Sequence, residues 1–175
     1  VAGNKSFLLN GKPFVIKAAE VHYPRIPRAY WEQRIKMCKA LGMNTLCLYV
    51  FWNIHEEKEG VFDWNGNRDL RRFVELCKKH DMDVIVRIGP FCHGEIRNGG
   101  LPDWLFARPV EVRSNDVNYL KYVERLYNEI AVQLKKLYYK DGGPIIGVQI
   151  ENEQQHSAAP WAIQYPGEQR DMTAA

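Results

Sequence analysis

Two glutamates and an asparagine, Glu151-Asn152-Glu153, directly follow a mostly apolar segment near the C-terminus of this 175-residue chain. That segment, Ile145 to Ile150, comes after Gly142-Gly143-Pro144, a turn-forming run, and is predicted to be a buried strand. A buried carboxylate is costly unless it is paired or used. Because catalytic groups gather at the carboxyl ends of parallel strands, the sequence predicts a functional site here.

The chemistry that two carboxyl groups could perform here is hydrolysis of a glycosidic bond. One carboxylic acid protonates the leaving oxygen, and a second carboxylate acts across the bond. Glu153 is the candidate acid, and Asn152 beside it is suited to hold a sugar 2-hydroxyl. Strand alternation places Gln149, Glu151 and Glu153 on one face, so spacing alone does not choose between the glutamates. The alternative for Glu151 is a salt bridge to an arginine of the sheet, such as Arg87.

Polar and aromatic residues also follow the three earlier predicted strands. They are Glu20, His22 and Tyr23 after the first strand, Tyr49 to Asn53 with His55 and Glu56 at the second, and Gly89 to Glu95 after the third. Because these strand ends meet at one edge of a parallel sheet, we expect their side chains to converge. Aromatic surfaces mixed with carboxylates and an amide suit a sugar, whose C–H faces stack on rings while its hydroxyls bind polar groups.

The individual roles of these residues differ. Glu95 is expected to bind sugar hydroxyls rather than to perform catalysis, because Glu153 already supplies the acid. Tyr49 is either a site residue or part of the core, since a phenol at a strand end often completes the packing. His22 and His55 are expected to be hydrogen-bonded structural residues.

The elements that must position these side chains alternate between strand and helix. The predicted strands are Phe14 to Ala19, Asn44 to Phe51, Val84 to Ile88 and Ile145 to Ile150. The predicted helices are Arg28 to Leu41, Arg68 to His80, one turn at Asp103 to Phe106, and a long helix capped by Ser114 or Asn115 that continues to about Tyr138. This order predicts a parallel sheet covered by helices.

Two α/β architectures fit such an order. An open doubly wound sheet would normally carry a Gly-rich phosphate loop after its first strand, but Glu20-Val21-His22-Tyr23-Pro24 stands there. A (β/α)₈ barrel needs about 250 residues. We therefore expect a (β/α)₈ TIM barrel that is truncated to about its first four βα units.

Composition excludes several other classes of protein. The net charge of +3 is spread along the chain instead of forming a basic stripe, so no nucleic-acid partner is expected. No apolar run approaches the ~20 residues of a membrane span. The chain begins Val1-Ala2-Gly3 without Met or a signal-like segment, and as a mature product it would be secreted or periplasmic.

The four cysteines lack the spacing of a metal site or a disulfide framework. Cys38, Cys47 and Cys77 are expected to be small buried thiols, while Cys92 lies near the predicted site and is left open. His93-Gly94-Glu95 matches half of the zinc deaminase motif, but the Pro-Cys-x-x-Cys half is absent. We therefore expect no metal and no cofactor.

Seven stretches of the chain together resemble glycoside hydrolase family 35. They are Gly11-Lys12-Pro13-Phe14, His22-Tyr23-x-Arg25-Ile26-Pro27-x-x-Tyr30-Trp31, Ala40-Leu41-Gly42-Met43-Asn44-Thr45, Tyr49-Val50-Phe51-Trp52-Asn53-x-His55-Glu56, Phe62-Asp63-x-x-Gly66-Asn67-Arg68-Asp69-Leu70, Gly99-Gly100-Leu101-Pro102-x-Trp104-Leu105 and Gly142-Gly143-Pro144-Ile145-Ile146-x-x-Gln149-x-Glu151-Asn152-Glu153. Members of that family are retaining β-galactosidases built on a (β/α)₈ barrel. The resemblance therefore implies that residues 1–175 are the N-terminal part of a glycoside hydrolase TIM-barrel catalytic domain.

The resemblance also implies roles for particular residues. Glu153 would be the general acid/base, and Tyr49, Glu95 and Asn152 would bind the galactose ring with help from the backbone near Gly94. The nucleophile of the family is a glutamate on a later strand, which no segment here matches, so we expect residues 1–175 alone to be inactive. The expected partners are a galactose-containing carbohydrate and the missing C-terminal part of the barrel.

The sequence departs from the family pattern in two places. Where the family favours Tyr-Ile-Cys-Ala-Glu-Trp, this chain has Phe91-Cys92-His93-Gly94-Glu95-Ile96, which keeps Glu95 but changes the wall of the sugar pocket. After Glu153 the family has an aromatic residue, whereas this chain continues with Gln154-Gln155-His156. Two alternatives follow: a degenerate, non-catalytic carbohydrate-binding relative, or the same hydrolase chemistry on another β-glycoside.

Overall fold

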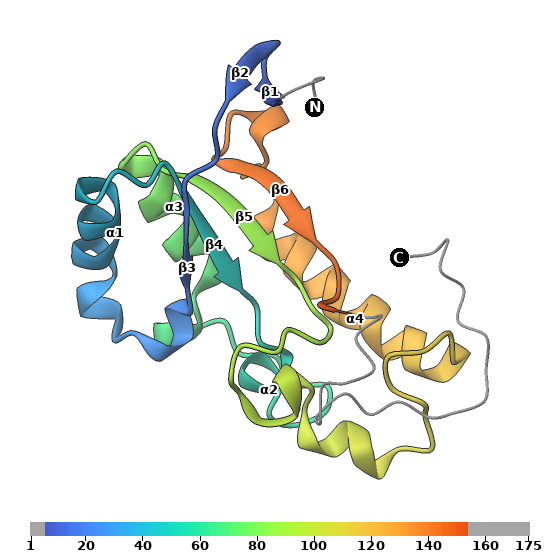
Figure 1. The fold of residues 1–175 in the computed structure, drawn as a ribbon. Helices are drawn as coiled ribbons and strands as arrows, with labels where there is room; N and C mark the ends of the chain where they lie inside the picture. Colours follow the sequence, from blue (N-terminus) through green and yellow to red (C-terminus); the bar gives the residue numbers. More distant parts are fainter. Residues whose placement is uncertain (1–5, 154–175) are drawn as a thin grey trace.

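The computed structural model describes residues 6–153, which form an α/β fold around one four-stranded parallel sheet (Figure 1). The strands follow one another across the sheet in chain order: β3 (Ala18–Val21), β4 (Thr45–Tyr49), β5 (Asp83–Arg87) and β6 (Ile145–Gln149). All three pairings are parallel. This sequential order is that of neighbouring strands in a (β/α)₈ barrel and confirms the predicted fold class.

Three long helices connect the strands, and Figure 1 shows them beside the sheet. They are α1 (Trp31–Ala40), α3 (Leu70–Lys79) and α4 (Val117–Leu134), with a short α2 (Trp52–His55) directly after β4. Six 3₁₀ turns complete the described chain, at Tyr23–Arg25, Arg28–Tyr30, Gly66–Arg68, Arg97–Gly100, Asp103–Ala107 and Tyr139–Asp141. The turn at Asp103–Ala107 confirms the expected helical turn.

The first predicted strand was placed too early. Phe14 belongs to an antiparallel hairpin of β1 (Phe7–Leu9) and β2 (Lys12–Phe14), which precedes the parallel sheet. Asn10 and Gly11 both have positive φ, as a tight hairpin turn requires. The first strand of the parallel sheet therefore begins at Ala18.

The cap of the long helix was also assigned wrongly. The side chain of Asp116, not that of Ser114 or Asn115, accepts hydrogen bonds from the backbone N–H groups at the start of α4. Ser114 instead accepts from the N–H of Asp116. α4 ends at Leu134, short of the predicted Tyr138, and Lys136 has a left-handed backbone with φ of 65°.

The main core lies between the sheet and the helices. Leu46 and Leu48 of β4 and Val84 and Val86 of β5 are fully buried, and they pack in one cluster with residues of all three long helices. Because side chains alternate along a strand, the other face of the sheet carries Cys47, Tyr49, Ile85 and Arg87. That face is the one available to a functional site.

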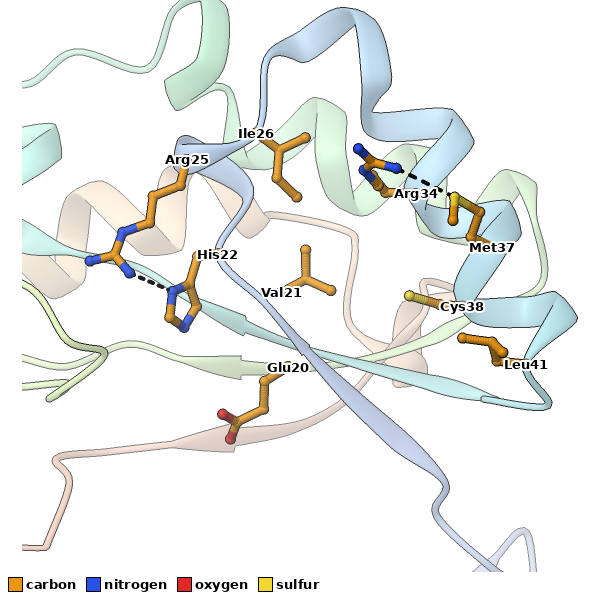
Figure 2. A pocket seen from close by; sticks show the side chains of 9 residues that line it. All are labelled: Glu20, Val21, His22, Arg25, Ile26, Arg34, Met37, Cys38 and Leu41. Atoms are coloured by element: carbon orange, nitrogen blue, oxygen red, sulfur yellow. Dashed lines mark hydrogen bonds between the residues drawn. The ribbon is translucent and has the colours of Figure 1, made fainter.

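Within residues 6–153, β3 and β6 form the two edges of the sheet, whereas a closed barrel has no edge. A groove of about 450 Å³ runs along β3 and α1 (Figure 2). Leu41, the residue that directly follows α1, lines this groove and is 77% exposed. No described element covers it. No helix of the described part is long and apolar enough to cross a membrane.

Candidate active site

The backbone after β6 leaves the strand conformation. β6 ends at Gln149, and both Glu151 and Glu153 have a left-handed backbone with φ of 59° and 49°. The expectation that Gln149, Glu151 and Glu153 share one face by strand alternation is therefore wrong. Non-glycine residues in this region of φ are uncommon, and such strain concentrates at functional sites.

Glu151 is held by an arginine of the long loop before α4. Its Oε2 lies 2.9 Å from Nη2 of Arg113, whose side chain is only 3% exposed. The same Nη2 donates to the backbone oxygen of Asn152 at 2.7 Å. Burial raises the pKa of Glu151, and the neighbouring Arg113 opposes that shift. The predicted salt bridge of Glu151 exists, but its partner is Arg113 and not Arg87.

Arg87 instead joins the sugar-binding candidates to one another. Its Nη1 lies 2.7 Å from Oε1 of Glu20 and also contacts the hydroxyl of Tyr49, while its Nη2 donates to Oδ1 of Asn152. The guanidinium carbon lies 4.1 Å from the centre of the Tyr49 ring, and the Tyr49 hydroxyl donates to Oε2 of Glu20 at 2.8 Å. The structure thus brings Tyr49 and Asn152 together through Arg87.

Neither Glu20 nor Arg87 was assigned this role from the sequence. The signal was present in the register, because Tyr49, Arg87 and Gln149 stand side by side across β4, β5 and β6. Arg87 is the last residue of β5 and pairs with Tyr49 of the neighbouring strand. An arginine at this position can reach the residues that follow the strands.

The loop after β5 carries two candidates, Gly94 and Glu95, in a run of three left-handed residues, His93, Gly94 and Glu95, with φ of 56°, 62° and 46°. A Cβ at Gly94 would lie 2.4 Å from Cε1 of Phe51, so only glycine fits there. The Glu95 side chain is exposed, and its backbone oxygen accepts a hydrogen bond from Nη2 of Arg25 at 2.9 Å. Glu95 is therefore accessible to a ligand.

Glu153 lies against this same loop. Its Oε2 is 3.4 Å from Nε2 of His93, and the side chains of His93 and Glu153 are 17% and 57% exposed. The acid candidate is thus accessible and directed toward the loop that also carries Gly94 and Glu95. Tyr49 and Asn152 both contact Arg87, the last residue of β5, and so lie at the carboxyl ends of the same strands.

Several residues expected near the site belong to the interior instead. His55 is buried between the Tyr23 hydroxyl, 2.6 Å from its Nε2, and the backbone oxygen of Asp63. Burial lowers the pKa of His55 to about 4. Glu56 is fully buried and accepts from Trp52, Gly60 and Arg125. These contacts confirm His55 as a hydrogen-bonded structural residue and remove Tyr23 and Glu56 from the site.

His22 is also hydrogen-bonded, as expected. Its Nδ1 lies 2.9 Å from Nη1 of Arg25, and its ring meets that of Tyr49 edge-on with centroids 4.5 Å apart. His22 thus packs against the ring of Tyr49 and helps to hold it in place.

The cysteines are unpaired thiols. Cys77 and Cys92 are buried, while Cys38 and Cys47 are partly buried. Burial raises the pKa of Cys92 to about 12, so its thiol stays protonated and unreactive at neutral pH. Within residues 6–153, no three His, Cys, Asp or Glu side chains are grouped so that they could hold a metal ion.

A β-sheet of this order, with polar and acidic residues at the carboxyl ends of its strands, defines part of a (β/α)₈ barrel. A solved structure with this fold is an exo-beta-1,4-mannosidase from Opitutaceae bacterium strain TAV5, with a TM-score of 0.61 and 17% identity. The likeness covers 87% of this chain and 27% of that one. At this identity it shows the fold alone.

Sequence comparison is more specific. The family model for Glycosyl hydrolases family 35 matches residues 6–175, and the chain belongs to this family. Similar relatives are a beta-galactosidase of Xanthomonas manihotis, 42% identical over 148 residues, and one of Mus musculus, 41% identical over 148 residues. Each match covers 84% of this chain, but 25% and 23% of those relatives. The chain thus spans about a quarter of their length.

Proposed function

We propose that the protein containing residues 6–153 hydrolyses terminal β-linked galactose with retention of configuration, and that Glu153 is its general acid/base. The observation that carries this proposal is the Arg87 cluster, in which Arg87 contacts Glu20, Tyr49 and Asn152. It holds the amide of Asn152 beside the Tyr49 hydroxyl, one residue before an accessible carboxyl group. Membership of the family and the names of the relatives support the choice of galactose.

Each candidate then has a task. Asn152, fixed by Arg87, presents its amide to the sugar 2-hydroxyl, where a hydrogen bond gains strength in the transition state. Tyr49 and Glu95 contact the other hydroxyls, and Gly94 lets the backbone approach because it carries no Cβ. Glu153 first protonates the leaving oxygen and then removes a proton from the attacking water.

The nucleophile of a retaining mechanism lies about 5–5.5 Å from the acid/base. In this proposal a glutamate that is not part of the 175-residue chain supplies it. The 175-residue chain alone is therefore expected to release no nitrophenol from nitrophenyl β-galactoside. Robust hydrolysis by that chain would show that the two catalytic carboxyl groups are both present in it.

The test of Glu153 uses a chimera in which residues 6–153 replace the matching segment of the Xanthomonas manihotis beta-galactosidase. Glu153→Gln should lower kcat/KM for an alkyl β-galactoside by about 10²–10⁴-fold, which is the usual contribution of general acid–base catalysis. Glu124→Gln, an exposed position on α4, is the matched control and should leave the rate unchanged.

Azide separates a missing base from a misfolded site. In Glu153→Ala, azide should accelerate turnover of an activated aryl galactoside and yield a β-galactosyl azide, because this anion attacks without giving up a proton. A chimera that is active but indifferent to Glu153 substitution contradicts the proposal. Turnover of aryl β-glucosides or β-mannosides in preference to the galactoside would transfer the same chemistry to another β-glycoside.

A further inference from the structure

The contact between His93 and Glu153 is not explained by the proposed roles of the sugar-binding residues. Nε2 of His93 lies 3.4 Å from Oε2 of Glu153, although the two residues come from loops after different strands, β5 and β6.

The imidazole of His93 is held in place on its own side. Its ring meets the ring of Phe91 edge-on, with centroids 4.7 Å apart and an interplanar angle of 76°. Phe91 is buried, and the guanidinium carbon of Arg113 lies 3.8 Å from the centre of its ring. The orientation of His93 is therefore set by a packed aromatic residue and not by the loop alone.

The same arginine fixes the loop that carries Glu153. Arg113 binds Oε2 of Glu151 and the backbone oxygen of Asn152, the residue directly before Glu153. The backbone N–H of Glu151 also donates to the oxygen of Gly89 at 2.8 Å, which ties the end of β6 to the start of the His93 loop. Both partners of the His93–Glu153 contact are thus anchored to one buried cluster, whereas the Glu153 carboxyl itself is mostly exposed.

We propose that His93 is a positioning residue for Glu153: its Nε2 holds one carboxyl oxygen so that the other faces the glycosidic oxygen. This inference rests on the proposed function, in which Glu153 transfers the proton. With its proton on Nε2, a neutral imidazole donates to this carboxyl oxygen whether the other oxygen of Glu153 is protonated or not, so no change of tautomer is needed. The same ring therefore supports Glu153 both before and after proton transfer.

The observed separation of 3.4 Å between Nε2 of His93 and Oε2 of Glu153 is slightly longer than a full hydrogen bond. A full N–H···O hydrogen bond spans about 2.7–3.2 Å, and catalytic hydrogen bonds often tighten only when substrate is bound. Charged groups on the neighbouring elements are the Arg113–Glu151 ion pair and Arg87, which binds Asn152. On the His93 loop itself is Glu95, whose backbone oxygen accepts a hydrogen bond from Arg25. Among residues 6–153, His93 is the one whose side-chain nitrogen lies within 4.0 Å of the Glu153 carboxyl oxygens.

The test compares two substitutions of similar size in the chimera. His93→Leu removes the nitrogen, and His93→Gln places an amide nitrogen near the position of Nε2. Loss of positioning of about 1 Å can cost on the order of 10²-fold. We expect His93→Leu to lower kcat/KM for an alkyl β-galactoside by about 10–10²-fold and His93→Gln to restore most of it. His80→Leu, which removes a contact between the residue that follows α3 and Glu32 of α1, is the control and should leave kcat/KM for both substrates unchanged.

The leaving group distinguishes positioning from general damage. A 2,4-dinitrophenyl β-galactoside needs little protonation of its leaving oxygen, so His93→Leu should leave its kcat/KM nearly unchanged. An equal loss on both substrates, or no loss on either, overturns the inference. If Glu153→Gln lowers kcat/KM for the alkyl galactoside much more than for the dinitrophenyl galactoside and His93→Leu does not, only the role of His93 is refuted. If Glu153→Gln does not separate them, the proposed function falls as well.

A measurement on the 175-residue chain itself requires no activity. The ring Hε1 proton of His93 should give nuclear Overhauser contacts to the Hγ protons of Glu153 in the unsubstituted chain. His93→Gln should keep the chemical shifts of Asn152 and Glu153 close to those of the unsubstituted chain, and His93→Leu should move them. Absence of the contact in a folded chain overturns the inference independently of any kinetic result.

Discussion

Replacement of Gly94 by alanine tests the geometry of the loop that carries His93, Gly94 and Glu95. Two costs add in Gly94→Ala. The left-handed backbone, with φ of +62°, disfavours any residue with a Cβ by about 1–2 kcal/mol. The new Cβ would also lie 2.4 Å and 2.7 Å from ring atoms of Phe51, which is fully buried.

Overpacking of this kind costs about 1–3 kcal/mol, so the free energy of unfolding should fall by about 2–5 kcal/mol in total. Gly66→Ala is the matched control, because Gly66 has a similar φ of +58° and nothing lies within 4 Å of the place that a Cβ would take there. That variant should lose only the backbone part, about 1–2 kcal/mol. Urea unfolding of the 175-residue chain, followed by circular dichroism, measures both values.

The steric part can be isolated further. Phe51→Leu removes the ring atoms that the new Cβ meets, so it should recover part of the stability in the Gly94→Ala background. In a double-mutant cycle, the two substitutions should therefore show a favourable coupling energy. Equal losses for Gly94→Ala and Gly66→Ala, or a coupling energy of zero, would refute the claim that Phe51 closes the space beside Gly94.

Two further predictions concern charged pairs. Arg113→Met leaves the largely buried carboxylate of Glu151 without its cation and should cost about 3–5 kcal/mol in urea unfolding, and adding Glu151→Leu should recover much of this loss. The second concerns Glu32, where hydrogen bonds from Lys79 and His80 lower its pKa from 4.5 to about 2. A depressed carboxyl pKa gives stability that is complete above pH 4.5 and lost as the pH falls toward 2. Glu32→Gln should thus be less stable than the unsubstituted chain at about pH 6 and equal to it near pH 2, and a pH-independent difference would contradict this assignment.

The order and type of the elements followed from the sequence by itself. Apolar runs of strand length alternated with amphipathic segments of helix length, and this local pattern identified all four parallel strands and the three long helices to within a few residues. The run that ends in Glu151-Asn152-Glu153 also predicted a site after the last strand, and the structure places Glu153 there, 3.4 Å from His93 of the loop after β5. The predicted ends of helices were wrong where a single side chain decides them, as at Asp116, which caps the start of α4.

The tertiary structure alone decided which partner each polar residue has. Arg113 and Glu151 lie 38 residues apart in the chain, and Arg87 lies 65 residues from Asn152, so no local pattern could pair them. The prediction that strand alternation continues beyond Gln149 was wrong. The left-handed backbone at Glu151 and Glu153 depends on contacts with the neighbouring loops, which the sequence pattern does not show. Local propensity determines where a strand or helix forms, whereas the direction of a side chain beyond its end depends on what packs against it.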